Sequence, residues 1–344
     1  MSRDVDALLS DPPLLPHALD MDRHAILFLS SDPDRVASAS FIDGRTDFSN
    51  APPILIPWTD ILRHVSQQPS SLCRFIFHVG FCGSTFLSRL LDAPGRVRVL
   101  REPNILADLA RHQASLDMKG QIDPNFASLC HAICTMLHRP WTSGETVVVK
   151  PSNWANNLLP GLAGEGGSTR ATYLTTSRAA FVRSIFRGGH DRLAFAARAA
   201  VHLSSRHRSD AELVAAALAR NGDDLDRLAG LAVALHAIQA GMFLRVNGNP
   251  GPERANLLHH DMIAARPRVA AQSAQRALVI DIPDDQLDAN LIRWSGHHAK
   301  APDTPYSSAA EQHHILETEA AHGDYIARAL DWATETIGED PFAR

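Results

Sequence analysis

Short apolar runs alternate with helical patterns along the chain from residue 71 onward. Between the runs, apolar residues recur on one helix face, as at Phe86, Leu87, Leu90 and Leu91. Strands that alternate with helices predict right-handed β–helix–β units and a mostly parallel sheet flanked by helices. The runs that fit buried strands are Arg74–Val79, Val97–Leu100, Thr146–Val149, Arg170–Thr175 and Ala255–His259.

The expected helices are unequal in length and spacing. Those within 193–247 interrupt the alternation, so we expect a helical insertion there that shapes an acceptor pocket. Gly323 predicts a break in the last helical region, Ile315–Ile337, and the preceding stretch 297–306 is predicted to be a polar loop. The other helical stretches begin near Ile105 and cover 127–137, 155–162, 178–187, 193–205, 211–247 with a break at Asn221-Gly222, and Pro283 to Leu287.

Residues 1–70 lack this alternation. We expect them to form an N-terminal appendage, β-rich, on a main domain of residues 71–344. Asp11–Pro16 is proline-rich and is predicted to be a loop, whereas Ala25–Leu29 and Ala39–Ile42 are predicted to be short strands. A chain of 344 residues fits one elaborated α/β domain of this kind.

Composition narrows the class of protein. With 45% hydrophobic and 21% charged residues, the chain has the material for a sizeable core. Its formal net charge of −5 argues against bulk nucleic-acid binding, which requires a basic face, but permits a local basic pocket. There is no CxxC pair and no HExxH pattern, so no metal site is expected. Neither a signal peptide nor a run of about 18 apolar residues is present, which predicts a cytoplasmic protein without a membrane span.

The segment HVGFCGSTFLSR joins the first predicted strand to a helix and has the character of an anion cradle. Its glycines, Gly80 and Gly83, allow a tight turn that points backbone N–H groups inward. The helix N-terminus adds unpaired donors, and Ser84 and Thr85 add hydroxyls. The alternative is an ordinary turn with a serine N-cap. The segment is not the G-x-x-x-x-G-K-S/T loop of magnesium-dependent nucleotide hydrolysis, because no lysine precedes the hydroxyl pair.

FHVGFCGSTFLSRLLD resembles the first phosphate loop of sulfotransferases, which has the form P-(R/K)-S-G-(T/S)-T and follows the first strand. Gly83, Ser84 and Thr85 match its glycine and hydroxyls, whereas the family's basic residue falls on Phe81 and its serine on Cys82. The resemblance extends to a set of uncharacterised bacterial P-loop proteins described as sulfotransferase-like. It implies a three-layer P-loop fold and the donor 3′-phosphoadenylyl sulfate (PAPS). The loop residues that would bind its 5′-phosphosulfate are Gly80, Phe81, Cys82, Gly83, Ser84 and Thr85.

Two further segments resemble parts of the PAPS site. In YLTTSRAAFVRSIFR, Ser184 matches the serine that holds the 3′-phosphate, the family's arginine position falls on Thr176, and Arg178 lies two residues beyond. Many sulfotransferases close over the nucleotide with a basic C-terminal loop, a role that Lys300 in WSGHHAKAPDTPY could fill. The alternatives are solvated arginines on a helix face and an ordinary surface loop.

Two residues at predicted strand ends are candidates for the chemistry. Glu102 follows the second strand, and some bacterial sulfotransferases are similar in having a glutamate there as general base for the acceptor. Lys150 ends the third strand and is the candidate cation for the transferring group. The alternatives are that Glu102 caps the next helix and pairs with Arg101, and that Lys150 is a solvated lysine.

Three functions are therefore weighed. The first is transfer of a sulfuryl group from PAPS to a hydroxyl or amine of a small molecule or peptide. The second is a kinase-like phosphotransferase that uses ATP with magnesium. The third is a non-catalytic nucleotide-binding protein of the same fold. The sequence predicts neither the acceptor nor an oligomeric state.

Overall fold

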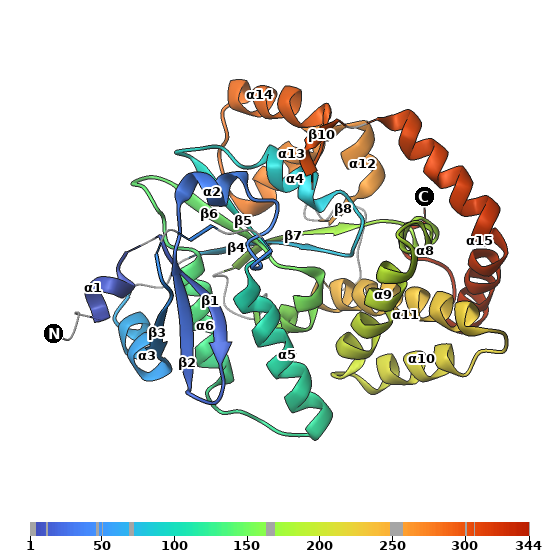
Figure 1. Cartoon of the computed structure of the whole chain (residues 1–344), viewed down its shortest axis with the longest axis horizontal. Helices are drawn as coiled ribbons and strands as arrows, with labels where there is room; N and C mark the ends of the chain where they lie inside the picture. Colours follow the sequence, from blue (N-terminus) through green and yellow to red (C-terminus); the bar gives the residue numbers. More distant parts are fainter. Residues whose placement is uncertain are drawn as a thin grey trace.

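The computed structural model describes residues 5–11, 13–45, 48–49, 51–68, 72–162, 169–247, 257–299, 301–305 and 307–343. Its centre is a five-stranded sheet in the order β5-β6-β4-β7-β8, with every neighbouring pair parallel (Figure 1). The predicted parallel α/β sheet is confirmed. Its strands are β4 (Cys73–His78), β5 (Val97–Arg101), β6 (Thr146–Lys150), β7 (Thr169–Thr175) and β8 (Leu257–His259).

Helices cover both faces of the sheet, which explains why consecutive apolar residues are buried in its central strands. Phe75, Ile76 and Phe77 of β4 are all fully buried. In Figure 1, α4 (Ser84–Leu90), α13 (Pro267–Leu278) and α14 (Asp284–Ser295) lie on one side. The other side carries α5 (Asn104–Lys119), α6 (Phe126–Leu137), the 3₁₀ helix η1 (Asn153–Leu158) and the short α7 (Leu159–Leu162).

A group of helices packs together to the right of the sheet in Figure 1. The long α11 passes the length and apolarity test for a membrane span over Asp224–Val246, but 72% of the tested window is buried in the fold. Gly323 does not interrupt the last helix as predicted. That helix packs against α8 and α11 through Ile326, Ala329 and Ala333, and this burial outweighs the weak helix propensity of one glycine. The group comprises α8 (Arg178–Arg187), α9 (Gly189–Ser204), α10 (Arg208–Leu218), α11 (Asp224–Asn247) and α15 (Ser308–Ile337).

The N-terminal segment contains a second, antiparallel sheet in the order β1-β2-β3. Asp11–Pro16 is not all loop, because β1 begins at Leu14 and tolerates Pro16 at a register shift. Ala39–Ile42 is not a strand; its Ala39 carbonyl instead accepts a hydrogen bond from Arg101. The elements are α1 (Val5–Leu9), β1 (Leu14–Asp20), β2 (Ala25–Ser30), α2 (Pro33–Ser38), β3 (Ile54–Pro57) and α3 (Trp58–Ser66).

Several C-terminal expectations also change. The helix predicted to end at Leu287 continues to Ser295, because Leu287 and Trp294 on one side of α14 are both buried. The segment 297–306 contains a short hairpin of β9 (His297–His298) and β10 (Ala301–Pro305) rather than only loop. Between β8 and α13 lies the unpredicted α12 (His260–Ala265).

Candidate functional site

The loop after β4 is held firmly at the carboxyl edge of the sheet, where ligands bind in folds of this kind. The Val79 N–H donates to the Leu174 carbonyl at 3.0 Å. The His78 ring lies between two carbonyls, with Nδ1 2.8 Å from Val79 O and Nε2 3.1 Å from Pro151 O. The Cys82 thiol donates to Val79 O at 2.9 Å. These bonds fix the loop without using the N–H groups that follow Val79.

The backbone of this loop forms a concave row of donors. Phe81 (φ +60°) and Gly83 (φ +79°) are left-handed and flank Cys82, which is not. Alternation of this kind turns successive N–H groups to one side and creates an anion-binding nest. The N–H groups of Gly80, Gly83, Ser84 and Thr85 donate to no group in the described part of the chain.

The two hydroxyls at the start of α4 are also unused. Ser84 and Thr85 are only 6% and 4% exposed, and among the described residues neither side chain makes a hydrogen bond. The N-cap of α4 is Gly83, which provides no side-chain cap, so the alternative of a serine N-cap is wrong. The two hydroxyls and the helix N-terminus are therefore available to an anion or to water.

Gly83 is required for both the backbone shape and the packing of the loop. A Cβ at this position would lie 3.4 Å from His260 Cδ2 and from Ile263 Cγ2. We expect Gly83→Ala to lower the free energy of unfolding by about 1–2 kcal/mol, because a left-handed alanine is strained, and to weaken anion binding. Urea denaturation and calorimetric titration with adenosine 3′,5′-bisphosphate measure the two effects. Gly95→Ala is the matched control: Gly95 has φ +77° and no neighbour within 4 Å of its Cβ, so it should lose stability only.

A cluster of buried side-chain amides lies next to the loop and is hydrogen-bonded to the strand that precedes it. Asn156 Nδ2 donates to His78 O and to Gln239 Oε1, each at 3.1 Å, and Asn153 Nδ2 donates to the same Gln239 oxygen at 3.3 Å. A Cβ on Gly80 would come within 3.3 Å of Asn153 Nδ2. Sequence reasoning missed this cluster, although three asparagines directly after a predicted strand were a visible signal.

The structure brings Glu102 and Lys150 together as a buried pair. Lys150 Nζ donates to Glu102 Oε1 at 2.5 Å, and the two side chains are 0% and 14% exposed. Arg45 Nη2 lies 4.0 Å from the other oxygen of Glu102. Both alternatives are wrong: Lys150 is not solvated, and Arg101 pairs with Asp92 rather than with Glu102.

Glu102 also has a strained backbone, with φ +57° and its N–H donating to Lys150 O at 2.6 Å. Such outliers in non-glycine residues often mark functional sites. Because β6 separates β5 from β4, Glu102 starts about 10 Å from the strand that carries the loop. Lys150, at the end of the adjoining strand β6, is fully buried, and its ammonium group is paired with Glu102.

Arg178 contacts the residues that follow α15. Its guanidinium donates to the carbonyls of Gly338 at 3.0 Å and Glu339 at 3.4 Å, and its N–H donates to Asp340 at 2.6 Å. Arg178 therefore fastens the segment that follows α15. Ser184 lies on α8, and its hydroxyl has no partner among the described residues. Lys300 lies outside the described residues.

Three residues that sequence reasoning missed lie close to the loop or its neighbours. Arg192 of α9 stacks on the ring of Phe81, with 4.7 Å between its guanidinium carbon and the ring centroid. His260, which follows β8, packs against Gly83. His236 of α11 is fully buried with Nε2 2.9 Å from Thr176 O, and burial lowers its pKa. Of these three, only His260 was marked by a local sequence feature, the pair His259-His260 at the end of the fifth predicted strand.

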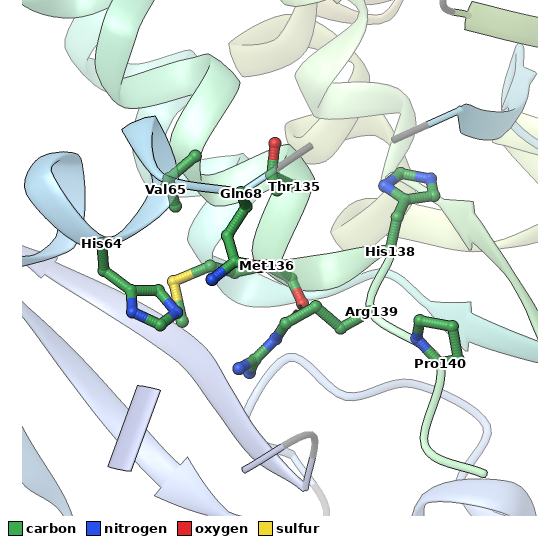
Figure 2. A pocket seen from close by; sticks show the side chains of 8 residues that line it. All are labelled: His64, Val65, Gln68, Thr135, Met136, His138, Arg139 and Pro140. Atoms are coloured by element: carbon green, nitrogen blue, oxygen red, sulfur yellow. Dashed lines mark hydrogen bonds between the residues drawn. The ribbon is translucent and has the colours of Figure 1, made fainter. Parts of the chain in front are cut away.

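A well-defined cavity lies at the opposite edge of the sheet. The cavity has a volume of about 190 Å³ and lies between α3, the end of α6 and the residues that follow α6. Figure 2 shows the side chains that line it. His138 in this lining is hydrogen-bonded on both ring nitrogens: its Nδ1 donates to Cys134 O at 2.7 Å, and the Arg74 N–H donates to its Nε2 at 2.9 Å. Burial lowers the pKa of His138.

In the described part of the chain, no cluster of three or more histidine, cysteine, aspartate or glutamate side chains could hold a metal ion. The site is therefore a nest of main-chain donors, with an aromatic–arginine stack on one side and a carboxylate–ammonium pair at the ends of the next two strands, β6 and β5. A scan against protein-family models finds no match for this chain, and a search of curated proteins finds no significant relative.

Proposed function

We propose that this chain is a sulfotransferase-like enzyme that binds PAPS and transfers its sulfuryl group to a hydroxyl or amine of a small molecule or peptide. The observation that carries the proposal is the row of unpaired N–H groups at Gly80, Gly83, Ser84 and Thr85, together with two unpaired hydroxyls. A dianionic phosphosulfate satisfies all of these donors at once. The loop's resemblance to the phosphosulfate loop of sulfotransferases selects the donor.

The proposed reaction assigns a role to each group. The loop N–H groups hold the 5′-phosphosulfate, and Ser84 and Thr85 add hydroxyl donors. The acceptor oxygen or nitrogen attacks sulfur, the bond from sulfur to the bridging oxygen breaks, and adenosine 3′,5′-bisphosphate leaves with the electron pair. Glu102 takes the acceptor proton, and Lys150 holds the Glu102 carboxylate in position. Ser184 is the candidate contact to the 3′-phosphate.

The kinase-like alternative has less support. A nucleoside triphosphate site of the usual kind needs a loop lysine and a magnesium ligand. The loop has no lysine, and the described residues include no metal cluster.

Calorimetric titration tests the proposal. We expect adenosine 3′,5′-bisphosphate to bind, and to bind more tightly than ATP with magnesium. Binding of ATP with magnesium alone would replace the proposal with a phosphotransferase. Binding of the bisphosphate without any transfer of radiolabelled sulfate from PAPS to a panel of phenols, alcohols and amines would reduce the function to nucleotide binding.

A further inference from the structure

The side of the loop at Phe81 is occupied by an arginine from another element. Phe81 is the position at which sulfotransferase loops carry their basic residue. Its ring packs on Phe181, with 6.0 Å between centroids, and the guanidinium of Arg192 stacks on it at 4.7 Å. A cation held on an aromatic face at this distance is attracted to the ring. A positive charge therefore lies one aromatic ring away from the loop backbone.

Arg192 has most of its hydrogen-bonding capacity unused. Of the five N–H donors of a guanidinium, one on Nη1 donates to Ser184 O at 2.8 Å, and no other partner is found among the described residues. The nearby carboxylate of Glu311 is taken by Arg187. Burial, reinforced by the positive charge of Arg187, lowers the pKa of Arg192, so an added anion would stabilise its charged form.

Gly188, at the junction of α8 and α9, makes the position of Arg192 possible. A Cβ at Gly188 would lie 1.8 Å from Arg192 Cδ. The backbone of Gly188 (φ −87°) is open to any residue, so the glycine is not needed for its own conformation. The arginine side chain runs directly over it.

We propose that Arg192 supplies the positive charge that the loop at 80–85 lacks and contacts the sulfuryl and phosphate oxygens of the donor. This inference rests on the proposed function and adds the residue that stabilises charge during transfer. Phe81 then acts as a platform that carries the cation instead of providing it. The loop's hydroxyl and N–H donors and the guanidinium surround the same anion.

Calorimetric titration of the full chain with PAPS tests this assignment. We expect Arg192→Gln to weaken PAPS binding about 10- to 100-fold, the range for losing one hydrogen-bonded charge. Arg192→Lys should retain part of the affinity. Gly188→Ala, which displaces the arginine without removing it, should also weaken binding. In Arg192→Gln, adding Phe81→Lys returns a cation to the loop and should recover part of the loss.

The matched control is Arg198→Gln, because Arg198 is an exposed arginine on the same helix. It should bind PAPS as the wild type does. If Arg192→Gln also binds as the wild type does, Arg192 has no such role, although the proposed function stands. If the wild type binds neither PAPS nor adenosine 3′,5′-bisphosphate, the proposed function fails, and inorganic pyrophosphate becomes the probe. If the wild type and Arg198→Gln bind pyrophosphate and Arg192→Gln does not, the inference holds for another phosphate ligand. If the wild type does not bind pyrophosphate, the inference is overturned.

Discussion

Glu102→Gln is expected to slow sulfuryl transfer by about 10²- to 10⁴-fold, the usual contribution of a general base, and to leave nucleotide binding unchanged. Glutamine keeps the shape of the side chain, and its Oε1 can still accept the hydrogen bond that Lys150 now donates at 2.5 Å. It cannot take a proton from the acceptor. Transfer of radiolabelled sulfate from PAPS to phenol and amine acceptors measures the rate, and titration with adenosine 3′,5′-bisphosphate measures binding.

Glu145→Gln is the control for that experiment. Glu145 is also a buried, paired carboxylate, 3.0 Å from Arg98, but it immediately precedes β6, at the opposite edge of the sheet. The Glu145→Gln variant should transfer the sulfuryl group at the wild-type rate despite any loss of stability. Transfer by Glu102→Gln at the wild-type rate would remove Glu102 from the mechanism.

Variants at Lys150 distinguish its effect on the position of Glu102 from its effect on the stability of the fold. Lys150→Ala leaves the Glu102 carboxylate without its partner, so both stability and rate should fall. A chain with Lys150→Met and Glu102→Gln together has no charge left unpaired there, so its stability should recover while its rate stays low. Recovery of the rate in that double variant would show that the pair is only structural.

The sheet could be predicted from the sequence because its central strands are buried on both faces and contain consecutive apolar residues, as in Phe75–Phe77 and Val147–Val149. The helices α6, α8 and α9 were also visible, since their apolar periodicity is regular. The segment 260–282 was not assigned: the six residues of α12 include one buried side chain, Ile263, and the adjoining α13 buries mostly alanines, so neither forms a strong apolar pattern. The N-terminal strands β1 and β3 were missed because each contains proline, which normally argues against a strand.

The site was predictable only where its residues are consecutive. The strand–loop–helix at Gly80–Thr85 follows from local sequence, and strand ends correctly marked Glu102 and Lys150 as neighbours of one sheet edge. Arg192 on Phe81 and His260 on Gly83 join segments more than a hundred residues apart, and nothing local encodes such contacts. Arg178 is a further long-range case: local sequence gives no indication of its hydrogen bonds to Gly338 and Glu339.

The second large effect concerns how the N-terminal segment is joined to the sheet. Arg101, at the end of β5, is 1% exposed and donates to the carbonyls of Val36, Ala37 and Ala39 at 2.6–3.0 Å. It also forms an ion pair with Asp92 at 2.7 Å. Arg89 of α4 donates to the carbonyls of Ala37 and Ser38 at 2.8 and 2.9 Å. Two buried guanidiniums therefore fasten the last turn of α2 and its C-cap, Ala39, to the sheet.

Arg101→Met is expected to lower the free energy of unfolding by about 3–5 kcal/mol, because it breaks the ion pair with Asp92 and leaves the carbonyls of Val36 and Ala39 without the donor that Arg101 provides. The methionine fills much of the volume, so the loss reports the missing hydrogen bonds rather than a cavity. Urea denaturation measures it, and limited proteolysis should show earlier cleavage between residues 39 and 45. Arg96→Met, at an exposed position just before the same strand, should change stability by no more than about 0.5 kcal/mol. If the two variants were equally stable, Arg101 would not be needed to hold the N-terminal segment, and its other contacts, including the hydrogen bonds from Arg89, would be sufficient.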